Sequence, residues 1–100
     1  MMDDILTLIT KTSAQDEIGA LIDKEVKTDV FAQVRSVSRS EFWNAGQKGL
    51  SPSLVAVTRY TNYDDQTEAI WKGKRYTIYR TYFDGHDDIE LYLEVQAYER

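Results

Sequence analysis

Residues 89–98 alternate between apolar and mainly polar side chains, and this pattern constrains the fold more than any other feature. Successive side chains of a β-strand point to opposite faces, so a period of two predicts a strand with one buried face. The apolar set consists of Ile89, Leu91, Leu93, Val95 and Ala97, and the set between them consists of Glu90, Tyr92, Glu94, Gln96 and Tyr98.

Similar but weaker signals predict further strands along the chain. A long strand is expected at 26–35, because Val26, Val30, Ala32 and Val34 share one parity. The other predicted strands lie at residues 5–10, 18–22, 54–61, 69–71 and 75–83, and the polar turns or loops at 12–16, 62–66 and 84–87. Gly73 indicates a tight turn whose central pair is either Lys72–Gly73 or Gly73–Lys74.

One short helix is predicted within this β pattern. Ser38-Arg39-Ser40-Glu41 fits a capping box, in which the serine and the glutamate satisfy free amides at a helix start. Phe42 and Ala45 are three residues apart, so we expect that face to pack inward and Trp43 to point away from it. Gly46 or Gly49 ends the helix, and Pro52 prevents a restart.

The strand register of the last hairpin follows if its loop has four residues. Tyr76 then pairs with Val95 and Ile78 with Leu93 on the core face, and Tyr79 pairs with Tyr92 on the other face. The same register places Thr77 and Thr81 opposite Glu94 and Glu90. It also places Arg80 opposite Leu91 on the otherwise apolar face, where we expect it to lie near the rim of a barrel.

These elements predict one mainly β domain over residues 1–100. Several short strands, regular turns and no βαβ pattern are typical of a small antiparallel β-barrel or sandwich, here with one short helix between strands. The longest apolar runs are far shorter than the roughly 20 residues of a membrane-spanning helix, and Met1-Met2-Asp3-Asp4 lacks the basic start of a signal peptide.

No constellation of residues predicts an enzyme, a metal site or a cofactor site. Cysteine is absent and His86 is the single histidine, in a turn with Asp84, Asp87 and Asp88. These carboxylates, like the adjacent pair Asp64-Asp65, are interpreted as a hydrated turn rather than a cation site. We therefore expect the protein to act by shape and assembly.

The charge and the aromatic residues bear on possible partners. The net charge is −5 and the basic residues are scattered, whereas nucleic-acid binding usually needs a basic stripe. All seven tyrosines lie between Tyr60 and Tyr98, and aromatic residues on both faces of a hairpin indicate a second contact surface or simply high β propensity. A barrel that binds single-stranded nucleic acid through stacking remains the alternative of a different class.

An ordered set of segments resembles the phage head–tail joining family, also called head-closure or stopper proteins. The resemblance covers Ile18 to Tyr98, and its pieces are the strand at 30–37, the helix at 40–46, the strand at 54–60, the turn segment at 70–78 and the strand at 89–93.

The resemblance implies a virion protein of the phage neck, made in the host cytoplasm. Copies would form a ring under the portal and adaptor, close the DNA exit, let DNA pass without specific binding and present a docking surface to the tail. Another neck or tail-completion role is the alternative. The expected partner or lumen contacts lie at 38–53 and 61–66, and the candidates are Glu41, Phe42, Trp43, Tyr63, Asp64 and Asp65.

Overall fold

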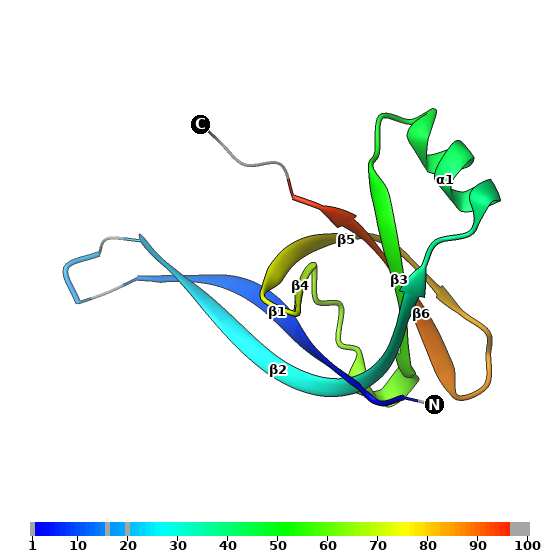
Figure 1. Cartoon of the computed structure of the whole chain (residues 1–100). Coiled ribbons are helices and arrows are strands. Elements are labelled where there is room, and N and C mark those ends of the chain that lie inside the picture. The colour runs from blue at the N-terminus through cyan, green and yellow to red at the C-terminus, as the bar shows by residue number, and fades with distance from the viewer. Residues whose placement is uncertain (1, 16, 20, 97–100) are drawn as a thin grey trace.

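Six strands and two short helices make up the part of the chain that the computed structural model describes, which is residues 2–15, 17–19 and 21–96. Helix α1 lies between β2 and β3, and the 3₁₀ helix η1 follows β3 (Figure 1). The elements are β1 (Asp4–Gln15), β2 (Leu21–Ser36), α1 (Arg39–Gly46), β3 (Pro52–Arg59), η1 (Tyr60–Asn62), β4 (Glu68–Trp71), β5 (Lys74–Phe83) and β6 (Asp88–Val95).

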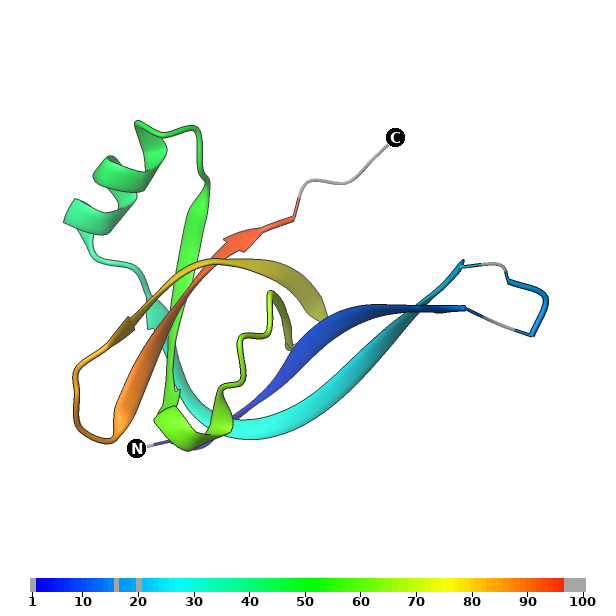
Figure 2. The same cartoon turned by 180° about the vertical axis from the view of Figure 1, so that it is seen from behind.

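The strands form a closed antiparallel barrel in the order β1-β2-β3-β6-β5-β4. The prediction of a mainly β domain is therefore confirmed. Of the two predicted architectures, a barrel and a sandwich, the chain forms the barrel. The barrel closes where Thr7–Ile9 of β1 pair with the short strand β4. Figures 1 and 2 look through the barrel from opposite sides and show the β1–β2 hairpin extending well beyond it.

The barrel interior holds the hydrophobic core. Both large and small side chains fill it, as is common in a narrow barrel. Burial of one leucine side chain contributes roughly 1.5–3 kcal/mol, so these positions dominate the stability of the fold. The buried cluster consists of Leu6, Leu8, Val30, Ala32, Ala56, Ala69, Tyr76, Ile89, Leu91 and Leu93. The inward face predicted for the last strand is thus confirmed through Leu93, and Val95 packs partly buried against the core, whereas Ala97 lies outside the described residues.

The N-terminal hairpin differs from the prediction. The expected turn at 12–16 is wrong, because β1 continues to Gln15 and pairs with β2 as far as Leu21. The expected strand at 18–22 is wrong at Ile18 and Gly19, which lie in the turn, and confirmed at Leu21 and Ile22, whereas Ala20 lies outside the described residues. Lys11 and Thr12 are exposed on a ribbon that leaves the barrel. Their polarity therefore reflects contact with solvent and not a turn.

A β-bulge at Tyr79 changes the register of the last hairpin. The predicted pairs Tyr76–Val95, Thr77–Glu94 and Ile78–Leu93 are confirmed. The predicted pairs Tyr79–Tyr92, Arg80–Leu91 and Thr81–Glu90 are wrong: Arg80 pairs with Tyr92, Thr81 with Leu91, Tyr82 with Glu90 and Phe83 with Ile89.

The bulge decides where Arg80 points. Phe83 pairs with Ile89, so the loop between the paired ends of the hairpin has one residue more than expected. The extra residue at the bulge, Tyr79, compensates for this shift, and the predicted pairing resumes at Ile78. Paired residues face the same side of a sheet, so Arg80 shares the outer face with Tyr92 instead of entering the apolar interior.

The β4–β5 turn uses Lys72–Gly73 as its central pair, because Trp71 pairs with Lys74. Lys72 has φ 51° and Gly73 has φ 77°, which is the conformation of a type I′ turn. The expected strand after Pro52 is also present, as β3, although it begins two residues earlier than predicted and ends at Arg59.

Replacing Gly73 by alanine is expected to lower the free energy of unfolding by about 1–2 kcal/mol, since a Cβ is strained at positive φ. Gly46 is the matched control: it lies in α1 with open space where a Cβ would be, so alanine there should be neutral or stabilising by up to about 1 kcal/mol. Urea unfolding measures both variants. Equal effects would contradict the turn assignment.

Candidate partner-contact site

The six candidate residues fall into two groups at opposite ends of β3. Glu41, Phe42 and Trp43 lie on α1, which precedes this strand, and residues 63–65 follow η1 at its other end. A strand of 8 residues spans roughly 25 Å. Figures 1 and 2 show the same separation from two sides. The structure therefore does not bring the two groups together into one site.

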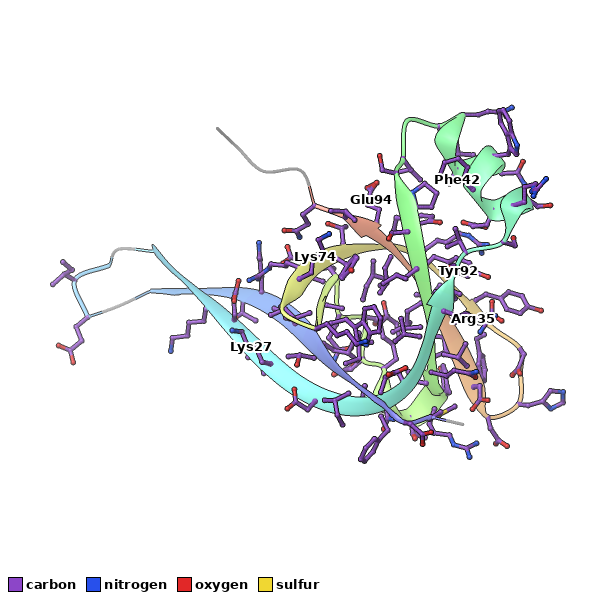
Figure 3. The ribbon with its side chains drawn as sticks, in the orientation of Figure 1. Lys27, Arg35, Phe42, Lys74, Tyr92 and Glu94 are labelled. Carbon is purple, nitrogen blue, oxygen red and sulfur yellow. The ribbon has the colours of Figure 1, made fainter. Side chains whose placement is uncertain are left out.

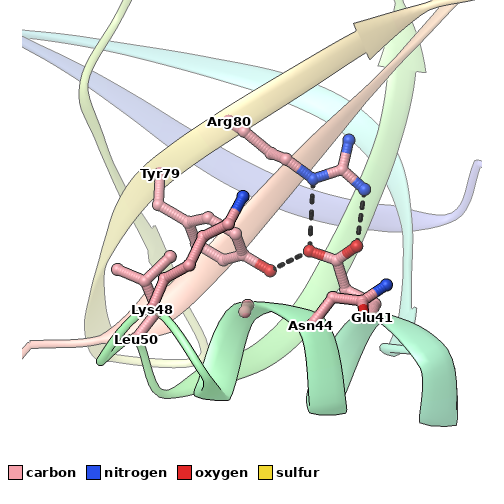
Figure 4. Close-up of a pocket in the computed structure, with 7 residues that line it drawn as sticks. Glu41, Asn44, Lys48, Leu50, Tyr79 and Arg80 are labelled. Carbon is pink, nitrogen blue, oxygen red and sulfur yellow. Dashed lines mark hydrogen bonds and ion pairs between the residues drawn. The ribbon is translucent and has the colours of Figure 1, made fainter.

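Helix α1 begins at the predicted cap. The Ser38 side chain accepts a hydrogen bond of 3.0 Å from the backbone N–H of Glu41, so the serine half of the capping box is confirmed. The Glu41 carboxylate does not face this cap but points toward β5 (Figure 4). The glutamate has a tertiary role that the local pattern did not indicate.

Glu41 forms a clamp with Tyr79 and Arg80 that fixes α1 on the outer wall of the barrel. Arg80 donates from Nη2 to Oε1 at 2.5 Å and from Nε to Oε2 at 3.2 Å, and the Tyr79 hydroxyl donates to Oε2 (Figure 4). The guanidinium also lies 3.8 Å from the ring centroid of Tyr92. The bulge makes this clamp possible, because it turns two successive side chains of β5 outward.

The Glu41 side of the clamp is largely shielded from water, whereas the Arg80 side chain is 45% exposed. The Glu41 side chain is 12% exposed. Its hydrogen bonds with Arg80 outweigh the effect of burial and hold the pKa of the carboxyl below its ordinary value. Burial and the neighbouring Glu41 carboxylate raise the pKa of the Tyr79 hydroxyl, so this tyrosine stays a donor. The clamp is therefore a charged, bidentate contact near neutral pH.

Phe42 and Trp43 are exposed on the clamped helix. The expected inward position of Phe42 is wrong: Ala45 is buried, but Phe42 is 57% exposed and Trp43 is 64% exposed. Glu41 and Ala45 are four residues apart and face the barrel together, which turns the next residue about 100° away. Phe42 then borders a shallow groove with Val37 and Pro52.

The segment after η1 is mainly structural. Tyr63 packs against the core, and its hydroxyl donates to the backbone oxygen of Gln66 at 2.9 Å. Burial raises the pKa of this hydroxyl. The Gln66 side chain in turn accepts from the backbone N–H of Asp64 at 2.7 Å. Asp64 and Asp65 are exposed, so their carboxylates are available to solvent or a partner.

Two exposed apolar features were missed in the sequence. Ile5 and Phe31 pair across β1 and β2 on the outer face and are 49% and 61% exposed. Tyr60 and Phe83 stack with ring centroids 3.9 Å apart. The sequence contains an indication of the first pair. Ile5 precedes buried Leu6, and Phe31 lies between buried Val30 and Ala32, so both occupy positions at which an alternating strand normally has polar, outward-facing residues.

An ion-pair network holds the base of the β1–β2 hairpin against β4 and β5. Glu68 accepts from Lys11 at 2.9 Å and from Arg75 at 2.8 Å, and Arg75 also contacts Glu25 of β2. Burial raises the pKa of Glu68, but the bonds from Lys11 and Arg75 outweigh it and the net direction is downward. The network fixes the direction in which the hairpin leaves the barrel.

The described residues offer little else that points to chemistry. They contain no group of three His, Cys, Asp or Glu side chains that would hold a metal ion. Asp84 accepts from the backbone N–H of His86 at 2.7 Å, and both residues are exposed in their turn. No helix in this part of the chain has the length and apolarity needed to cross a membrane.

Comparison with known proteins identifies the family. A family model described as phage head completion protein matches residues 2–100. No curated protein matches the chain significantly. The match confirms the resemblance to proteins that complete and close phage heads, and it supports a structural role in the virion. Because it covers nearly every residue, the chain belongs to the phage head completion protein family.

Proposed function

We propose that this protein closes the DNA exit of the filled head at the phage neck, beneath the portal and adaptor, and provides the surface to which the tail docks. Family membership carries this proposal. A closed barrel with a clamped helix and exposed large aromatic residues supports it, because such residues on a rigid wall are typical of protein–protein contacts.

In this proposal copies of the chain form a ring, and DNA passes through it without specific binding. The partners are further copies, the portal or adaptor above and tail proteins below. The net charge of −5 suits a passage that does not hold DNA by its phosphates. No catalytic step is required of the protein, since closure and docking depend on shape and on contacts.

Electron microscopy of particles from a phage or prophage lacking the gene tests the proposal. Tailless heads that have lost their DNA, beside finished free tails, are the expected result. Normal tailed particles would overturn it, and oligonucleotide binding would then be measured, with strong salt-sensitive binding pointing to a nucleic-acid-binding barrel.

Trp43→Ala is expected to leave the stability of the free chain within about 1 kcal/mol of the wild type, because the side chain is 64% exposed. The same variant should give heads that lose DNA and lack tails. Position 63 is tested with Tyr63→Phe instead of Tyr63→Ala, because the Tyr63 ring packs against the core and phenylalanine keeps that ring. Complementation of the gene deletion, scored by tailed particles, measures both. Full complementation by Trp43→Ala would remove this residue from the contact surface.

Reversing the charges of Asp64 and Asp65 to lysine is expected to slow DNA ejection, because cations beside a passage attract phosphates. Both carboxylates are exposed, so the fold should tolerate the change. Ejection kinetics at low and high salt measure the effect, and Lys74→Glu serves as a charge-changing control on β5. An unchanged ejection rate would show that these two positions do not face the DNA.

A further inference from the structure

The two ends of β3 carry different unpartnered surfaces. At the α1 end, Phe42 (Figure 3) and Trp43 are exposed on the helix. The Glu41 clamp holds this helix in place (Figure 4). At the η1 end, Phe31 and Val57 border an open groove on the outer wall, together with Met2, Arg59 and Asp88. We call the first surface the α1 knob and the second the Phe31 groove.

The two surfaces also differ in charge. Near the α1 knob, Arg39 and Lys48 are exposed and form no ion pair among the described residues. Near the Phe31 groove, Arg59 lies beside several carboxylates, and it contacts Asp88 at 3.3 Å and Asp87 at 4.0 Å. The turn after β5 belongs to the same end, since the backbone N–H of Tyr60 donates to the backbone oxygen of Asp87 at 2.7 Å. The further exposed carboxylates of this end are Asp64, Asp65 and Asp84.

We propose that the α1 knob of one copy binds the Phe31 groove of the next copy. The aromatic side chains Phe42 and Trp43 would then cover the apolar wall beside Phe31, and the basic α1 end would meet the acidic η1 end. The Arg59 guanidinium beside this groove would then lie over the ring face of Trp43 from the neighbouring copy. A cation over a tryptophan ring is attracted to it, and tryptophan and arginine are enriched at the centres of interfaces.

Charge argues for this head-to-tail contact over a symmetric one. A two-fold contact of knob with knob brings Arg39 and Lys48 of both copies together, and a contact of groove with groove brings two acidic ends together. Like charges at an interface are unfavourable. A contact between unlike surfaces leaves one knob and one groove free in each pair of copies, so it continues from copy to copy and closes into a ring if the rotation allows.

This inference rests on the proposed neck function in one respect, namely that copies of the chain meet in a ring. What it adds is which two surfaces form the contact between neighbouring copies. The absence of cysteine from the chain makes disulfide mapping clean. Ser40 lies one helical turn before Trp43, and Gln33 borders the Phe31 groove, and both are exposed. Ser40→Cys and Gln33→Cys therefore report on the two surfaces without removing the apolar side chains.

The test uses particles that carry the double variant Ser40→Cys/Gln33→Cys, oxidised and analysed by non-reducing electrophoresis. The expected result is a ladder of dimers, trimers and higher species, whereas either single variant gives no dimer. Lys74→Cys/Gln33→Cys is the control for chance collisions, since Lys74 lies away from α1 (Figure 3). Trp43→Ala in the double-cysteine background should abolish the ladder, with melting of the free chain confirming that this variant folds.

The remaining outcomes decide the proposal independently of the neck function. Dimers formed by Ser40→Cys alone or by Gln33→Cys alone indicate a symmetric contact and overturn it. Absence of the ladder in DNA-filled tailed particles that contain the chain overturns it too, even though the neck function stands. If the gene deletion gives normal tailed particles, purified Ser40→Cys and Gln33→Cys chains are mixed at increasing concentration. A mixed disulfide then supports the contact, and its absence overturns it.

Discussion

Leu6→Ala is expected to lower the free energy of unfolding by about 2–5 kcal/mol, because the leucine side chain is fully buried and its loss leaves a cavity in the barrel. Leu6 pairs with Val30, which belongs to the same core cluster. A domain of this size is stable by roughly 5–15 kcal/mol in total, so the change removes a large fraction. Chemical denaturation of the purified chain measures it.

Ile5→Ala is the matched control for this prediction. Ile5 is the preceding residue on β1, but its side chain points outward and is 49% exposed. Truncation there is expected to cost about 1 kcal/mol or less. A similar loss for both variants would contradict the register of β1 against β2. The comparison is made on the free chain, so that contacts with other copies do not contribute.

The sequence predicted the strands best where one side of the barrel wall faces the core and the other faces water. β6 is such a strand, and Ile89, Leu91 and Leu93 are buried as the alternation indicated. Outside that setting the same rule failed. The hairpin beyond the barrel has polar residues such as Lys11 and Thr12 exposed, so its polarity was mistaken for a turn.

Barrel closure and the bulge are nonlocal features, and local patterns did not determine them. Closure depends on three residue pairs between β1 and the short strand β4, which are about 60 residues apart in the chain. The bulge left one sign in the sequence, which was Arg80 on an apolar face. A charged residue at a core position was in fact evidence that the register shifts before it.

The local structure around the candidate residues was predicted in part. The capping pattern located α1, and Trp43 points outward as expected. The contact of Glu41 with β5 was beyond reach, because it joins residues 39 positions apart through the bulge. The Phe31 groove was not predicted, because the alternation pattern indicates which residues face the core and says nothing of exposed apolar residues such as Phe31.

Glu41→Gln is expected to lower the free energy of unfolding by about 1–2 kcal/mol at neutral pH. The amide keeps the shape of the side chain but loses its charge, and hydrogen bonds between charged partners contribute more than neutral ones. It also leaves the Arg80 guanidinium without its bidentate acceptor. Glu17→Gln in the exposed turn is the control and should change stability by less than about 0.5 kcal/mol.

The effect of Glu41→Gln should depend on pH in a defined direction. The pKa of Glu41 is lowered in the folded chain, so its contribution to stability is fully present above the unfolded-state pKa near 4.5. It is lost as the pH falls through the lower folded-state value, where the carboxyl takes up a proton. The difference between wild type and variant should therefore be constant from about pH 6 upward and shrink in acid. A difference that stays constant into acid would show that the charge of Glu41 does not hold the helix.

Arg80→Ala separates the clamp from other effects of the glutamate. If the two residues act together, the double variant costs less than the sum of the single variants, with a coupling of about 0.5–3 kcal/mol. Because the clamp fixes the helix that carries Phe42 and Trp43, both single variants should also weaken DNA retention in particles, although neither residue lies in the proposed knob contact. Normal retention beside a confirmed loss of stability would show that partner binding itself holds α1 in place.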